Sequence, residues 1–142
     1  MAGVSQALAT KVLNATTPTG ASGVPGSFAA YGGSSMKVKL TSTASSAAAS
    51  GTELTGTGYT AGGQNVGNQS AASSAGSSVT LPATAALSWT NGSGGAWTIQ
   101  SFELTDSAGV RTWFGNFTGQ PVSVANGNTF TIAVAGITIG LS

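Results

Sequence analysis

Charge is the property that this sequence has least of. Among its 142 residues, four are Lys or Arg and three are Asp or Glu, whereas a typical soluble domain has about a quarter of its residues charged. Gly, Ala, Ser and Thr take the place of charge and make up more than half of the chain. Surface charge keeps a free protein apart from its neighbours. The composition therefore indicates a component of an assembly, with much of its surface covered by other subunits.

Cysteine and histidine are both absent. Their absence excludes disulfides and thiolate chemistry and removes the commonest metal ligands, so we expect no cofactor and no metal. The formal net charge of +1 provides no basic surface for a phosphate backbone. Nucleic acid is therefore not an expected partner.

Long apolar runs are also missing. No stretch approaches the roughly 20 apolar residues that a membrane span needs, so we expect no membrane partner. The N-terminus, MAGVSQALATKVLNA, has no basic start followed by a continuous apolar run, so we expect no secretory signal. We expect the protein to stay where it is made until it is assembled.

What the chain does contain is a series of short β-strand patterns. MKVKLT, residues 36–41, alternates apolar residues with Lys37 and Lys39. SSVTLP and ALSWT predict two more strands, the first stopped by Pro82. WTIQSFELT, residues 97–105, predicts a strand with Trp97 and Ile99 on one face and Phe102 and Leu104 on the other.

Turn signals separate these strands. DSAG, residues 106–109, predicts a hairpin that returns as VRTWFGNFT, with Asp opening the turn and Gly supplying a positive φ. Asn126-Gly127 predicts a second hairpin after PVSV. Beyond it, apolar residues occupy even positions from 130 to 134 and odd positions from 137 to 141. A β-bulge or bend near Ala135-Gly136 would return both sets to one face.

The N-terminal half has weaker patterns. Residues 4–15 predict a short amphipathic helix that packs on its own domain or on a neighbouring subunit. Residues 16–35, rich in Gly and Pro, predict an irregular arm. Residues 43–78 predict a long loop past Glu53, Leu54 and Tyr59, with a thin strand near 64–70.

Catalytic patterns are poor. Without histidine, nucleophilic catalysis would need a Ser–Lys dyad, but Lys37 and Lys39 are explained by strand alternation. Glu103 and Asp106 lie three positions apart, yet Asp106 is better explained by turn chemistry. Gly56-Thr57-Gly58 follows no strand that would support a dinucleotide site. We therefore expect a protein that is not an enzyme.

The order of segments resembles a family of small tailed-phage virion proteins, whose members are labelled head decoration, minor capsid or tail-fibre proteins. The resemblance rests on LATKVLNA near the N-terminus, GTELTGTGY (51–59), FELTDSAGVRTWFGNFT and the closing PVSV…GNTFTIAVAGITIGL (121–141). The chain departs from the family in the Gly/Pro-rich insert at 16–35 and in its low charge. The resemblance implies a virion location on the outer surface of the capsid, with the major capsid protein and further copies of the chain as partners.

Together these observations predict a mainly β protein: an antiparallel β-sandwich, jelly-roll or immunoglobulin-like, at 36–142, preceded by a short helix and an irregular arm at 1–35. The expected function is to decorate and stabilise an icosahedral capsid as a homo-oligomer, with a trimer suiting local threefold positions. The alternative is a tail or fibre component that recognises a host glycan through Trp89, Trp97 or Trp113. The expected partner-binding residues are the apolar anchors of the N-terminal segment, namely Val4, Leu8, Val12, Phe28 and Tyr31.

Overall fold

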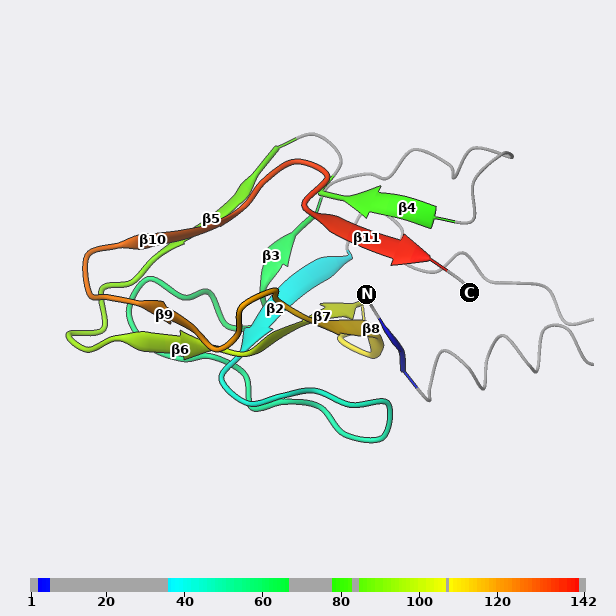
Figure 1. Cartoon of the computed structure of the whole chain (residues 1–142), viewed down its shortest axis with the longest axis horizontal. Coiled ribbons are helices and arrows are strands. Elements are labelled where there is room, and N and C mark those ends of the chain that lie inside the picture. Colours follow the sequence, from blue (N-terminus) through cyan, green and yellow to red (C-terminus); the bar gives the residue numbers. More distant parts are fainter. Residues whose placement is uncertain (1–2, 6–35, 67–77, 83–84, 107, 141–142) are drawn as a thin grey trace, which may run out of the picture.

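The computed structural model describes residues 3–5, 36–66, 78–82, 85–106 and 108–140 (Figure 1). These residues form eleven strands and the loops between them. In chain order the strands are β1 (Gly3–Val4), β2 (Lys37–Thr41), β3 (Gln64–Asn65), β4 (Ser78–Leu81), β5 (Leu87–Thr90), β6 (Trp97–Ile99), β7 (Ser101–Thr105), β8 (Arg111–Asn116), β9 (Val122–Val124), β10 (Thr129–Ile132) and β11 (Ile137–Gly140). The protein is mainly β, as predicted.

All of the strand pairings are antiparallel. One sheet has five strands in the order β1-β8-β7-β2-β3, and the other strands form the pairs β5–β10, β4–β11 and β6–β9. Because β4 leads into β5 and β10 leads into β11, the pairs β5–β10 and β4–β11 follow one another as a long ribbon (Figure 1). That ribbon lies beside the five-stranded sheet.

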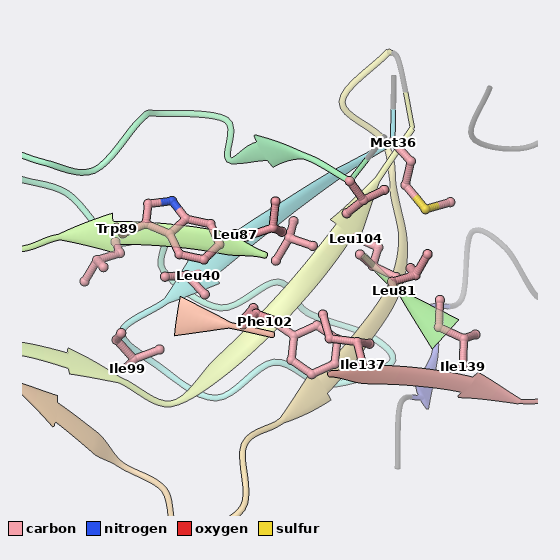
Figure 2. Close-up of a cluster of buried hydrophobic side chains, with 14 of the residues drawn as sticks. Met36, Leu40, Leu81, Leu87, Trp89, Ile99, Phe102, Leu104, Ile137 and Ile139 are labelled. Carbon is pink, nitrogen blue, oxygen red and sulfur yellow. The ribbon is translucent and has the colours of Figure 1, made fainter. Parts of the chain in front are cut away.

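One hydrophobic cluster joins the ribbon to the sheet (Figure 2). Val38, Leu40 and Leu104 come from the sheet and are fully buried. The ribbon contributes Leu81 and Trp89, which are also buried. Burial of apolar surface stabilises a fold by about 25 cal/mol per Å². This shared cluster is therefore the main source of the free energy that holds the ribbon against the five-stranded sheet.

The predicted strand at 36–41 is confirmed, since the alternate residues of β2 are buried and Lys37 is exposed. The predicted strand at 97–105 is divided in two at Gln100. β6 pairs with β9, whereas β7 pairs with β2 and β8. All five residues of β7 are buried, so both of its faces are covered, which simple alternation did not predict.

The two turn predictions have different outcomes. Asp106 and Gly109 form the β7–β8 hairpin: Asp106 Oδ1 accepts hydrogen bonds from the backbone N–H of Ala108 and Val110, and Gly109 has φ 78°. A turn also forms at Asn126-Gly127, where Gly127 has φ 85°. The hairpin prediction there is wrong, however, because β9 pairs with β6 and β10 pairs with β5.

The apolar residues shift from even to odd positions after residue 134. A bend between two strands produces this shift, rather than a bulge within one strand. β10 ends at Ile132 and β11 begins at Ile137. Between them Ala135 has φ 59°, and its N–H donates to the carbonyl of Pro82, which directly follows β4. Ile137 and Ile139 return to the core, but Val134 is 49% exposed. The expectation that Val134 shares the buried face is therefore wrong.

The predicted N-terminal helix does not begin at Val4, because Gly3–Val4 is a strand paired with β8. The rest of the predicted helix and the arm at 16–35 lie outside the described residues. In the predicted long loop at 43–78, β3 lies at the start of the expected thin strand, and Thr41 and Glu53 form an isolated bridge.

Candidate functional site

A buried carboxylate lies on the face of β7 that points away from the hydrophobic core. Glu103 is fully buried, and its Oε1 accepts hydrogen bonds from Ser45 Oγ at 2.8 Å and from the backbone N–H of Gly51 at 3.0 Å. Arg111 Nη1 lies 3.3 Å from the same oxygen. Lys39 Nζ lies 3.6 Å from Oε2, which accepts no hydrogen bond from the atoms that the structure describes. Two cations thus compensate one carboxylate.

The loop at residues 42–52 covers this face of β7 and is held there by Glu103 and Arg111. Arg111 donates from Nη1 to the carbonyl of Ala49 at 2.8 Å and from Nη2 to that of Ala47 at 3.2 Å. Ser45 N–H donates to Ser101 Oγ at 3.1 Å. A Cβ at Gly51 would lie 2.4 Å from the carbonyl oxygen of Thr43, so only glycine fits there. Glu103, Lys39 and Arg111, here called the Glu103 cluster, thus hold this loop against the sheet.

A second carboxylate organises the segment Gly51–Tyr59. Glu53 Oε1 accepts a hydrogen bond from the Tyr59 hydroxyl at 3.1 Å and one from Gly62 N–H at 2.6 Å. The Tyr59 oxygen in turn accepts from Leu40 N–H at 3.2 Å. Burial raises the pKa of the Tyr59 phenol above its ordinary value, and the nearby Glu53 charge adds to the rise. The phenol therefore stays a neutral hydrogen-bond donor.

A buried amide links the end of β5 to β9 and to the turn before β6. Asn91 is fully buried; its Nδ2 donates to the carbonyls of Gly95 and Val124, each at 2.8 Å. Its Oδ1 accepts from the N–H and hydroxyl of Ser93. The Asn91 side chain thus uses all of its hydrogen-bonding groups within the fold.

An open groove of about 260 Å³ lies between β8 and β11. Phe102, Phe117 and Ile137 provide its apolar lining. Asn116 and Thr138 provide polar lining, and their side chains are exposed. The Phe117 ring also packs on Phe102, with ring centroids 5.3 Å apart. No sequence pattern pointed to this groove, because its residues come from separate strands.

The structure separates the candidate catalytic residues. Glu103 is bound to Arg111 and Lys39, whereas Asp106 forms the β7–β8 turn. Lys37 is exposed. Glu103 and Asp106 thus have separate structural roles, one in an ion pair and one in a turn.

The proposed sugar-stacking residues are mostly buried. Trp89 and Trp97 are 1% and 3% exposed, so the prediction that they form an exposed platform is wrong. Both indoles face the core because β5 and β6 alternate inward at those positions. Trp113 is half-buried on β8.

The expected partner-binding residues are mostly outside the described part of the chain. Leu8, Val12, Phe28 and Tyr31 lie outside the residues that the structure describes. Val4 lies in β1, in register with Trp113.

Comparisons of the chain with family models, with curated proteins and with solved structures give no match. The resemblance to phage virion proteins therefore stays a prediction. In the described residues, no group of three acidic, Cys or His side chains is placed to hold a metal. Nor does that part of the chain hold a helix with the length and apolar character to span a membrane.

Proposed function

We propose that this chain is a non-enzymatic structural protein of a tailed-phage virion. It decorates the outer surface of the icosahedral capsid and stabilises it by bridging subunits of the major capsid protein. In this proposal the chain acts as a homo-oligomer, with a trimer suiting local threefold positions. In this proposal its architecture is an antiparallel β-sandwich of the jelly-roll or immunoglobulin-like kind.

The observation that carries this proposal is the location of the few charged side chains, most of which bind other groups within the fold. Glu103, Lys39 and Arg111 are bound to one another, and Glu53 is bound to Tyr59. Among the charged residues that the structure describes, Lys37 alone is exposed. A nearly neutral exterior is typical of a surface that other subunits cover, because charged residues are depleted in interface cores.

Neutral hydrogen-bonding groups remain on the exterior. On the β5–β10 pair, the exposed hydroxyls of Ser88 and Thr131 lie 3.1 Å apart, and those of Thr90 and Thr129 lie 2.8 Å apart. Each hydroxyl can both donate and accept. Contacts made by such groups and by small apolar residues would depend little on salt, which suits a protein that must hold a capsid in varied surroundings.

The direct test compares capsids that contain the chain with capsids that lack it. We expect capsids without the protein to rupture at a lower temperature, and purified protein to restore the higher one. The affinity of the added protein should change by less than about threefold between about 0.05 and 0.5 M salt, because few charges can be screened. Equal rupture temperatures with and without the protein would contradict the stabilising role.

The groove at Phe117 supports a second candidate, a tail or fibre component that recognises a host glycan. An aromatic ring beside neutral amide and hydroxyl groups is suited to a sugar. Here Asn116→Ala and Thr138→Ala should each weaken glycan binding, whereas Val134→Ser, on the exposed bend, should leave it unchanged. Equal binding by all three variants would exclude this groove.

A further inference from the structure

The N-terminal strand adds to the edge of the five-stranded sheet. Gly3 and Val4 are in register with Phe114 and Trp113 of β8. Ser5 continues the pairing: its N–H donates to the carbonyl of Thr112 at 3.0 Å, and its Oγ donates to the carbonyl of Arg111 at 2.8 Å. Ser5 is 1% exposed. The edge of β8 is therefore a formed binding site for residues 3–5.

The connection from this strand to the rest of the sheet is much longer than the distance requires. In the order β1-β8-β7-β2, the antiparallel pairings place Ser5 and Lys37 at the same end of the sheet. Three strand spacings of about 4.8 Å separate β1 from β2, or about 14 Å. About five extended residues would span that distance. The chain has thirty, residues 6–35, whose extended length of about 100 Å exceeds the width of a small domain.

A connection of this length lets the strand reach the β8 edge of another copy as well as its own. The hydrogen bonds would be the same in both cases, because the donor and acceptor sequences are identical. Exchange of an identical element between protomers is a low-cost route to an oligomer. Among the charged residues that the structure describes, Lys37 alone is exposed. Two copies of the chain can therefore approach closely with little electrostatic repulsion.

We propose that residues 3–5 of one copy pair with the β8 edge of a neighbouring copy, so that each subunit gives one strand and receives one. The proposal deepens the self-association in the proposed function and rests on that part alone. It assigns the contact to the backbone of residues 3–5, which pairs with β8 and with the carbonyl of Thr112, and to the Ser5 hydroxyl, which bonds the carbonyl of Arg111. Its tests use the isolated protein, so they can fail while the capsid test succeeds, and the reverse.

The absence of native cysteine allows a clean cross-linking test. The hydrogen bond from Ser5 to Thr112 makes Val4 and Trp113 a non-hydrogen-bonded pair, in which Cα atoms lie about 4.5 Å apart, within the range that a disulfide spans. Val4→Cys in one copy and Trp113→Cys in a copy with a different tag are co-expressed and mildly oxidised. We expect a mixed disulfide dimer, identified by its linked peptides.

The matched control pairs Val4→Cys with Val134→Cys, which is exposed on the ribbon, and should give no mixed dimer. The double variant Val4→Cys/Trp113→Cys in one chain should form linked oligomers. A double variant that yields only internally cross-linked monomer, with no mixed dimer from the single variants, would overturn the proposal.

A second measurement avoids altering Trp113. Ser5→Pro removes the N–H that pairs with Thr112, whereas Ser5→Ala keeps it and loses only the hydroxyl. Sedimentation should show that Ser5→Pro lowers the oligomer mass to that of a monomer, with an unchanged β-sheet spectrum, and that Ser5→Ala remains an oligomer. An oligomer that is equally stable in both variants, or a wild-type protein that is monomeric, would refute strand exchange.

Discussion

Replacing Arg111 by Met tests whether the Glu103 cluster stabilises the fold. The substitution keeps much of the side-chain volume but removes the guanidinium 3.3 Å from Glu103 Oε1, together with its bonds to the carbonyls of Ala47 and Ala49. Glu103 is fully buried. Breaking a buried ion pair costs about 3–5 kcal/mol, and Lys39 remains as a second cation, so we expect about 3 kcal/mol.

Urea unfolding followed by tryptophan fluorescence measures this loss, because Trp89 and Trp97 are buried. With a slope of about 2 kcal/mol per M, the unfolding midpoint should fall by about 1.5 M. Lys37→Met is the matched control: it removes a cation from the exposed face of β2 and should change stability by less than about 0.5 kcal/mol. A fall of less than about 0.3 M for Arg111→Met would refute the reasoning.

Three further predictions concern the loops and the alkaline limit of stability. Gly58→Ala should lower stability by more than about 3 kcal/mol, since its Cβ would lie 1.7 Å from the carbonyl oxygen of Thr90. Gly62→Ala, also at positive φ but with open space, should cost only about 1 kcal/mol by the same unfolding assay; equal losses would contradict the packing argument. Asn91→Ala should cost about 2–4 kcal/mol because it removes the four hydrogen bonds of a fully buried amide, one of them to the buried carbonyl of Val124, and an unfolding midpoint unchanged from wild type would contradict this. The raised pKa of Tyr59 means that its contribution to stability is complete below pH 10.0, its ordinary pKa, and is lost as the pH rises toward the folded pKa; thermal melts should show this alkaline decline in the wild type and a smaller one in Tyr59→Phe.

The strands themselves could be predicted from the sequence where one face is buried and the other exposed. β5 follows this rule throughout, and β2 follows it at its start, where Lys37 is exposed and Val38 is buried. Which strands pair could not be predicted. The Asn126-Gly127 turn has the residues of a hairpin, yet Asn91 O accepts from Gly127 N–H and Asn91 N–H donates to Asn128 O. A distant segment, rather than the turn itself, decides the partner of β10.

The buried carboxylate could not be predicted for a similar reason. Alternation in β7 places Phe102 and Leu104 inward and Glu103 outward. The covering loop, which includes Ser45 and Gly51, is more than fifty residues away in sequence and consists of small residues with no strong pattern. The one local signal is Lys39, which is directly opposite Glu103 in the β2–β7 register, and that register was known only from the structure.

Decoration of the capsid surface by this chain is the central proposal. Labelling with an antibody to this chain, viewed by negative-stain electron microscopy, tests it on purified tailed-phage particles whose genome encodes the chain. The proposal predicts label over the whole outer surface of the head. Label confined to the tail tip, with a bare head, would contradict it.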